Sequence, residues 1–364
     1  MPSPRFPVRG KSCARPGRHQ PVMWTGHGTC RRCTVFGQTR FRHHRPLPEP
    51  EWPCPMTIAQ PALAPASSAL GGYVFALTGV AIWAGWTVVT RMDMRGTMAI
   101  TDLVALRFAT AGLLLLPVLL RKGLPLKRLG IGGVLALAGT AGAPYVLIAG
   151  GGHAFAPVSH SGVLICCGVP LATALLTRLF LGERFSRLRV IGYGLILVAA
   201  AILMIEAVLG TGLGPQVLLG DVMFMTGALM WAGYTVLVRH HGLDPLHSTA
   251  MVATVSAALY LPVYVLFLDP GIAKLSWGTI ALEAGFQGVL TSIVSLLLFS
   301  IAIGRIGASR TSALTALVPA AAALLAIPVL DEWPSLVQVA GILTGTLGVA
   351  LASGALALPG SRRA

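Results

Sequence analysis

Residues 78–91 read TGVAIWAGWTVVTR, and residues 226–239, displaced by 148 positions, read TGALMWAGYTVLVR. Eight of the fourteen positions are identical. A second correspondence, displaced by 149 positions, aligns Pro170 with Pro319, Glu183 with Glu332, and Gly192 with Gly341. The chain therefore contains one unit twice. Because each copy is rich in apolar stretches long enough to cross a bilayer, the duplication is typical of secondary transporters.

The composition indicates a membrane protein. The 364 residues are 55% hydrophobic and only 11% charged, with a mean hydropathy of +0.76. A soluble fold needs a charged surface, and few residues here could form one. The net charge is +15, of which +8 belongs to residues 1–55. A basic tail together with positively charged cytoplasmic loops explains this excess, so we expect a lipid bilayer and no nucleic acid as the partner.

Residues 1–55 lack apolar periodicity. We interpret them as a basic leader that is either disordered or translated upstream of the true start, followed by a linker over residues 56–71. Cys30 and Cys33 have a zinc-ligand spacing, but no apolar pattern surrounds them on which a zinc module could fold. We therefore expect no metal, no cofactor and no catalytic residue.

Ten apolar runs of bilayer length predict an all-α membrane protein. The predicted helices cover residues 72–90, 102–120, 129–151, 157–180, 188–208, 217–238, 246–268, 277–302, 306–330 and 335–357. They form two five-helix repeats, 72–208 and 217–357, and leave a short basic tail over 358–364. Because five is an odd number, the second repeat enters the membrane from the opposite side, which makes the repeats inverted in topology.

The distribution of basic residues predicts the orientation. If the N-terminus is cytoplasmic, the cytoplasmic side receives thirteen Arg or Lys residues: Arg121, Lys122, Lys127, Arg128, Arg178, Arg184, Arg187, Arg189, Arg239, Arg305, Arg310, Arg362 and Arg363. The outer loops receive three: Arg91, Arg95 and Lys274. This bias places both termini in the cytoplasm.

Several of these features resemble the EamA-type branch of the drug/metabolite transporter superfamily. They are the five plus five helices, the TGxxxWAG[WY]T segment that opens each half, Arg107 in the second helix, and Pro170 followed by Gly182-Glu183-Arg184. The resemblance implies an inner-membrane carrier, usually an exporter of amino acids or other small metabolites. One departure is Asp331, which stands where a Gly-Glu pair is more usual, so the turn there could differ.

Arg107 lies well inside the second predicted helix, where a cation costs several kcal/mol unless it is paired or hydrated. One interpretation is a site for a substrate carboxylate. The alternatives are an ion pair with Asp102 or snorkelling towards the outer surface.

The duplicated segment also places aromatic side chains three residues apart on one face of each first helix, where they could line a central cavity. The proposed lining consists of Trp83, Trp86, Trp231 and Tyr234, with Arg107, Tyr145, Gln287 and Ser292 as further polar groups.

Four residues are candidates for helix breaks or gating: Pro170 and Pro319, which interrupt predicted helices at equivalent points of the two halves, and Glu183 and Glu332, which fall at helix ends. We expect the two glutamates at the membrane interfaces, beside Arg184 or Asp331. His153 and His160 are titratable candidates, but a short outer loop is expected to hydrate them.

Other functions remain open at this stage. Gly341 and Gly345 form a GxxxG motif that predicts close helix contact and leaves a homodimer open. A passive channel or membrane scaffold is one alternative function. An intramembrane hydrolase has only His160-Ser161-Gly162 to support it, and adjacent helical residues point about 100° apart.

We predict that residues 1–55 are dispensable, because they lack both apolar periodicity and a targeting signal. A chain that starts at Met56 should reach the membrane at the level of the full chain, as measured by immunoblotting of membrane fractions. Loss of insertion, or folding that depends on zinc, would contradict this expectation.

Overall fold

The computed structural model describes residues 66–209 and 214–354, which are helical throughout apart from short connections. Nine helical segments in these ranges are long and apolar enough to cross a membrane, and the 17-residue apolar helix Leu336–Ala352 is a tenth, shorter one. The prediction of an all-α membrane protein is thereby confirmed. The leader with its cysteines, the first part of the linker and the basic tail lie outside the described residues.

The first half contains α1 (Ala66–Met92), η1 (Asp93–Thr97), α2 (Ile100–Lys122), α3 (Leu126–Ala141), α4 (Ala143–Tyr145), η2 (Val146–Gly150), η3 (Gly152–Ala154), α5 (Val158–Ser161), η4 (Gly162–Cys167), α6 (Gly168–Leu181) and α7 (Arg187–Leu209). The second half contains α8 (Gly214–His240), α9 (Pro245–Phe267), η5 (Ile272–Lys274), α10 (Trp277–Glu283), η6 (Ala284–Val294), α11 (Ser295–Ile306), α12 (Ala308–Leu314), η7 (Thr315–Leu317), α13 (Val318–Leu330) and α14 (Leu336–Ala352).

Most predicted boundaries lie within a few residues of the observed ones. The largest difference at the start is α1, which begins at Ala66, so residues 66–71 of the expected linker are helical. The predicted third, fourth, eighth and ninth helices are each divided by a change of helix type, and in the third, fourth and ninth a proline, which lacks a backbone N–H, lies near the change.

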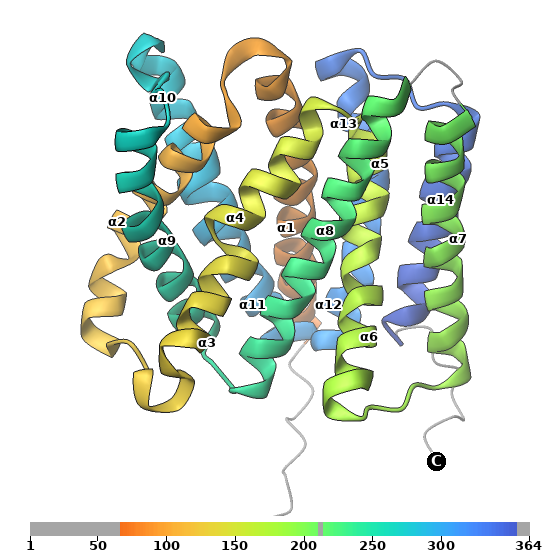
Figure 1. The fold of residues 1–364 in the computed structure, drawn as a ribbon. Coiled ribbons are helices and arrows are strands. Elements are labelled where there is room, and N and C mark those ends of the chain that lie inside the picture. The colour runs from red at the N-terminus through yellow and green to blue at the C-terminus, as the bar shows by residue number, and fades with distance from the viewer. Residues whose placement is uncertain (1–65, 210–213, 355–364) are drawn as a thin grey trace, which may run out of the picture. The chain divides into compact units, whose positions relative to one another are not determined.

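Figure 1 shows that α1 and α8, the first helices of the two halves, run in opposite directions, as inverted repeats require. Each first helix packs against the fourth helix of the other half: α1 against α13, and α8 against α6. The two second helices, α2 and α9, form another pair, and the two fifth helices, α7 and α14, pack along their length. The halves are therefore joined by exchanged contacts rather than laid side by side.

Several helices begin at side chains that satisfy free backbone N–H groups. Asp244 accepts a hydrogen bond from the N–H of His247 at 2.8 Å, and Ser276 and Ser335 cap α10 and α14 in the same way at 3.1 Å. Asp244 also binds Lys122 Nζ at 2.9 Å, which ties α2 to α9 outside the apolar region. The hydrogen bonds from Lys122 and His247 lower the pKa of the Asp244 carboxyl.

The turn after α13 is the same as the turn after α6, despite the change of sequence. Gly182 and Asp331 are both left-handed, with φ of 66° and 54°. In both turns the following glutamate N–H reaches back six residues, to Thr177 O or Ala326 O, at 3.4 Å. This pattern is a Schellman helix end. The expectation that Asp331 could alter the turn is thus wrong, because an aspartate tolerates the left-handed region better than most residues do.

The GxxxG motif of α14 is used within the chain. A Cβ atom on Gly341 would lie 3.1 Å from Leu203 of α7, and one on Gly345 would lie 3.4 Å from Ala199. The small residues therefore allow α7 and α14 to approach closely, as the motif predicts for helix contact.

The closest approach of these two helices generates a stability prediction. A Cβ on Gly192 would lie 2.6 Å from backbone atoms of Gly348 and Ala352, which cannot move independently. Gly192→Ala should therefore destabilise the protein by about 1–3 kcal/mol, visible as a lower melting temperature in detergent. Gly194→Ala on the same helix is the control, because nothing lies within 4 Å of its Cβ position. Equal melting temperatures for the two variants would contradict the packing.

Candidate functional site

Arg107 of α2 lies at a contact between the two halves. Its Nη1 atom is 3.3 Å from both Gln287 Oε1 and Thr291 Oγ1 of η6, and its guanidinium lies over the ring of Trp86, 5.9 Å from the centroid. Gln287 is fully buried, and Trp86 is 8% exposed. Arg107 therefore connects α1, α2 and η6 inside the bundle.

The irregular backbone of η6 helps to form this arrangement. Residues Ala284–Val294 are π-helical, and the carbonyl of Gln287 accepts hydrogen bonds from the hydroxyls of Thr291 and Ser292, both at 2.7 Å. π-helical segments are frequent at functional sites because they redirect side chains and free backbone acceptors. Ser292 therefore contributes here by binding its own helix.

Around Arg107 the site is rich in unsatisfied hydrogen-bond donors. Trp86 Nε1, Arg107 Nε and Gln287 Nε2 are all buried without an acceptor at full hydrogen-bonding distance, and the buried Glu283 carboxyl, one turn earlier on the same helix, is the acceptor nearest to the Gln287 amide. An unsatisfied buried donor costs about 1–3 kcal/mol, and more when it is charged. In the described residues, no carboxylate forms an ion pair with Arg107. Three such donors are chemically suited to a ligand that supplies oxygen acceptors and a negative charge.

Asp102 is not the partner of Arg107. Its carboxylate accepts hydrogen bonds from the Tyr264 hydroxyl and, at 3.0 Å, from the N–H of Gly271. The proposed Asp102–Arg107 pair is therefore wrong, because α9 and the segment after it satisfy Asp102 first.

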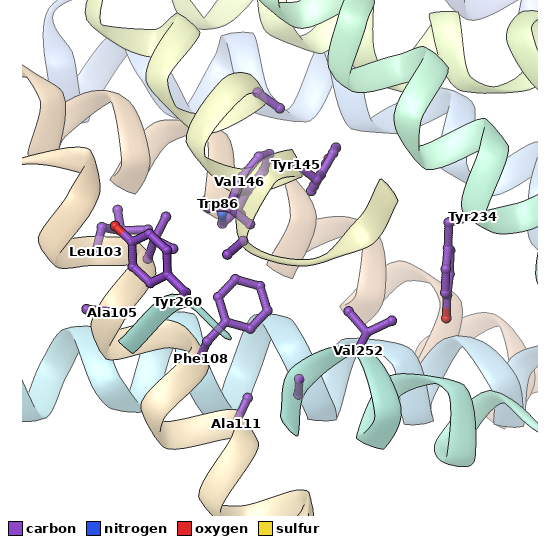
Figure 2. Packing of buried hydrophobic residues seen from close by; sticks show 14 of the residues in the cluster. Trp86, Leu103, Ala105, Phe108, Ala111, Tyr145, Val146, Tyr234, Val252 and Tyr260 are labelled. Atoms are coloured by element: carbon purple, nitrogen blue, oxygen red, sulfur yellow. The ribbon is translucent and has the colours of Figure 1, made fainter. Parts of the chain in front are cut away.

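The aromatic residues of the duplicated segment divide into two groups. Trp86, Tyr145, Trp231 and Tyr234 belong to one hydrophobic cluster, part of which Figure 2 shows. Trp231 contacts Tyr145 and Tyr234 with ring centroids 5.2 Å and 5.4 Å apart. Trp83 belongs to a different cluster and packs on Phe299 at 5.1 Å. Trp83 lies about two helical turns before Arg91 and faces α11, which separates it from the other three aromatic residues.

A groove of about 320 Å³ lies beside this cluster, between α3, α4 and α9. Tyr260 and Ser256 contribute to its wall, and exposed leucine and valine side chains form its rim. None of the residues expected to bind substrate is part of its lining.

Pro170 and Pro319 both lie at the start of a regular helix that follows an irregular turn. Pro170 is the third residue of α6, directly after the π-helical η4, and Pro319 is the second residue of α13, directly after the 3₁₀ turn η7. Each change of helix type leaves backbone groups that a continuous α-helix would use.

Glu332 is the centre of a network at the end of the bundle where α1 ends, here called the Arg91 end. Its Oε1 accepts hydrogen bonds from Arg91 Nε at 2.8 Å and Arg95 Nη2 at 2.6 Å. Its Oε2 accepts from the N–H of Val158 at 3.0 Å. Arg95 also donates to Leu330 O at 2.7 Å. The network ties α1, η1, α5 and α13 together.

The equivalent pair lies at the opposite end, here called the Arg239 end, where Arg239 of α8 binds Glu183 after α6. The repeat thus exchanges its ion pairs, because each arginine binds the glutamate of the other half. From the sequence we expected the two glutamates beside Arg184 or Asp331, but neither of these residues is their ion-pair partner. The ends differ in exposure: the Arg91 and Glu332 side chains are each 14% exposed, whereas those of Arg239 and Glu183 are 59% and 30% exposed.

His153 and His160 are both fully buried, so the expectation of a hydrated loop is wrong. The segment from η3 to η4 turns back into the bundle instead of remaining outside it. The His153 ring packs between Trp86 and Phe224, at 5.7 Å and 4.9 Å. Cys167 beside them is fully buried and Cys166 half-buried, and both are free thiols, in agreement with a packing role.

The hydrolase alternative receives no geometric support from this segment. The hydroxyl of Ser161 donates to Val158 O at 3.0 Å, and His160 faces Asp221 instead. The nucleophile–base hydrogen bond that a hydrolase needs is not formed between these two residues.

Sequence reasoning missed the buried carboxylates. Glu206 and Asp221 are 6% and 0% exposed, and Asp93 and Glu283 are 2% and 7% exposed. The signal was present, because Glu206, Asp221 and Glu283 are single acidic residues inside predicted apolar spans, where a charge is costly.

Comparisons with known proteins agree with this architecture. The model of the EamA-like transporter family matches residues 70–205 and 218–354, one match for each half. The chain is 31% identical over 206 residues to the "Uncharacterized transporter YyaM" of Bacillus subtilis (strain 168), and the match covers 55% of this chain and 66% of that protein, just under two thirds of its length. A solved crystal structure shares the fold with a TM-score of 0.54 and 20% identity, covering 79% of this chain and 97% of its own.

We predict that Arg107→Gln weakens the binding of a small carboxylate ligand by about 10- to 100-fold, the loss of one charge-assisted hydrogen-bond donor. The amount of inserted protein should stay near normal. The measurement is the thermal shift that a panel of amino acids and small carboxylates produces in detergent. Arg121→Gln, at the exposed end of the same helix, is the control. Lower stability of Arg107→Gln with unchanged ligand shifts would show that Arg107 only packs and pairs.

Proposed function

Since the chain belongs to the EamA-like transporter family, and is therefore a membrane transporter of small molecules, we propose that it exports amphipathic metabolites such as amino acids by alternating access. The observation that carries the substrate class is the set of unsatisfied donors around Arg107. An amino acid offers a carboxylate for Arg107 and Gln287, and an apolar side chain for the ring of Trp86.

The charge distribution supports a proposal for the orientation in the membrane. We propose the inner membrane, with both termini in the cytoplasm and the Arg91 end facing outwards. The bias of thirteen basic residues against three supports this orientation. Export rather than uptake rests on the resemblance to exporters of the same family. We propose no enzymatic activity.

The exchanged ion pairs support alternating access. Each pair joins the first helix of one half to the fourth helix of the other, at one of the two ends of the bundle. Rocking of the halves would break one pair while the other stays closed. An exposed pair such as Arg239–Glu183 contributes about 0.2–1 kcal/mol, whereas the Arg91 and Glu332 side chains are largely shielded from water, so their attraction is screened less. The Glu332 network therefore favours a state closed at the Arg91 end.

A counterflow experiment tests the function. Proteoliposomes loaded with one amino acid should take up the same labelled amino acid faster than empty ones, because a carrier exchanges substrate across the membrane. A passive channel or a scaffold would show no such stimulation. A metabolite-export screen of a deletion strain would supply the candidate substrates.

We predict that Glu332→Gln opens the Arg91 end. Loss of the carboxylate leaves Arg91 and Arg95 without their counter-charge, with only the carbonyl groups of His153 and Leu330 as acceptors. A cysteine introduced by Val158→Cys, at a fully buried position beside this network, should then react with a membrane-impermeant maleimide about ten times faster or more. The parent protein for this comparison carries Val158→Cys, has all native cysteines replaced and keeps Glu332.

Glu183→Gln is the matched control, because it breaks the equivalent pair at the other end. It should leave the Val158→Cys reaction unchanged or slower. Equal rates in Glu332→Gln and the parent would show that the network does not close this end.

A further inference from the structure

His160, Asp221 and Glu206 form a buried group of three titratable side chains near the Arg91 end. His160 Nδ1 is hydrogen-bonded to Asp221 Oδ1 at 2.8 Å, and His160 Nε2 lies 3.8 Å from Glu206 Oε2. The side chains of His160 and Asp221 have no exposure, and that of Glu206 is 4% exposed. The imidazole therefore lies between two carboxyl groups that water does not reach.

Hydrogen bonding leaves part of this group unsatisfied. Ser335 donates to Glu206 Oε1 at 2.6 Å. The atoms His160 Nε2, Asp221 Oδ2 and Glu206 Oε2 have no hydrogen-bond partner. Within residues 66–209 and 214–354, no lysine or arginine forms an ion pair with either carboxyl group. The group has to balance its own charge.

The neighbouring elements offer no compensating cation either. Of the elements packed against α5, η3 contains His153, η4 contains Cys166 and Cys167, and α1 contains Tyr73 and Arg91, whereas α13 and α14 contain no titratable side chain. Arg91 and Arg95 are bound to Glu332. Glu332 in turn accepts a hydrogen bond from the N–H of Val158, which is two residues before His160 in the chain. The bases of the other packed helices lie towards the Arg239 end: Lys127, Arg128, Arg178, Arg187, Arg189, Arg239 and His240.

Charge counting then requires bound protons. With both carboxyl groups ionised and the imidazole neutral, the group carries a charge of −2, and protonation of the imidazole alone leaves −1. A buried, uncompensated charge costs several kcal/mol, so neutrality needs two bound protons, either as an imidazolium with one carboxylic acid or as a neutral imidazole with two carboxylic acids. In water, both carboxylic acids would be ionised at neutral pH. Opening of the Arg91 end to water would therefore release at least one proton.

The repeat shows that the fold itself does not require these side chains. The equivalent positions in the other half, at displacements of 148 and 149, carry Tyr73, Ser309 and Ala355 in place of Asp221, His160 and Glu206. The three residues are therefore particular to one end of an otherwise duplicated frame.

Contacts join the group to the network and to the Arg107 site. The four-residue helix α5 carries both His160 and Val158, whose N–H binds Glu332. Phe224, one turn after Asp221 on α8, contacts His153, which contacts Trp86, and Trp86 lies under Arg107. Movement of α5 when the network breaks would displace His160.

We propose that His160, Asp221 and Glu206 form a proton-binding site that is loaded while the Arg91 end is closed and releases a proton when that end opens. The inference rests on the proposed alternating access, and it makes transport depend on proton exchange at this end. A proton is favoured over a metal cation because the described residues contain no set of three side chains arranged to hold a metal ion.

Infrared spectroscopy on the purified full chain tests the bound proton without any substrate. The C=O stretching band of a carboxylic acid should be present at neutral pH. Its intensity should fall in the Asp221→Asn, Glu206→Gln double variant, and the two proteins are compared by difference spectra because Asp93 and Glu283 are also buried carboxyl groups. Asp244→Asn, at the exposed carboxyl bound to Lys122, is the control and should leave the intensity unchanged. An unchanged intensity in the double variant would overturn the assignment to this site.

The coupling between proton release and opening is tested by measuring the rate of the Val158→Cys reaction over a range of pH. Each rate is divided by the rate in the Glu332→Gln background at the same pH. Because the closed state holds more protons, the relative rate should rise with pH, by up to about tenfold per pH unit for one linked proton. The double variant should lose this dependence. Replacement of sodium by choline should change nothing, and a sodium dependence would overturn the proton in favour of a cation.

The two proposals fail differently. If Glu332→Gln opens the Arg91 end but the relative rate of the parent is independent of pH, the proton coupling is wrong and alternating access stands. If Glu332→Gln itself leaves the reaction unchanged, the network is not the closure, and the infrared band still decides whether the site holds a proton.

Discussion

The rest of the structure depends on one constraint: a charge placed within or beside an apolar bundle has to be compensated, either by a counter-charge in the protein or by a bound ligand or proton. The duplicated unit meets this constraint by exchange. Arg91 and Arg239 occupy equivalent positions, and each binds the glutamate that the opposite half provides, Glu332 or Glu183. Neither half could satisfy its own arginine in this way, so the pairing also joins the halves. The identical Schellman turns after α6 and α13 present the two glutamates in the same geometry.

Equivalent backbones nevertheless carry different chemistry. Arg107 has Val255 at its equivalent position, and His160, Asp221 and Glu206 have no carboxyl or imidazole counterparts in the other half. The two ion pairs also differ in exposure, which is a second difference between equivalent positions. At the Arg91 end, unlike the other end, the glutamate is surrounded by two arginines and a backbone N–H. Duplication supplies a frame with two matched ends, and substitutions at a few positions make the ends unequal.

The buried charge that lacks compensation has opposite signs at the Arg107 site and at the His160 site. Around Arg107 the unsatisfied atoms are donors and the charge is positive, which suits an anionic ligand. Around His160 the excess charge would be negative, which suits a proton. The chain of ring contacts from Arg107 through Trp86, His153 and Phe224 places these sites in one packed unit. A change at either site is therefore felt by the same helices, α1 and α8.

The sequence by itself determined the helix number, the two inverted halves and the family, because hydropathy and a fixed displacement are properties of order along the chain. It also identified Arg107, since a cation inside an apolar span is visible without coordinates. Only the tertiary structure decided the partners. Asp102 binds Tyr264 rather than Arg107, the two glutamates bind arginines of the opposite half, and His160 is buried between two carboxyl groups. Each of these contacts joins residues at least 46 positions apart, and such pairings depend on which helices pack together, which apolar periodicity does not encode.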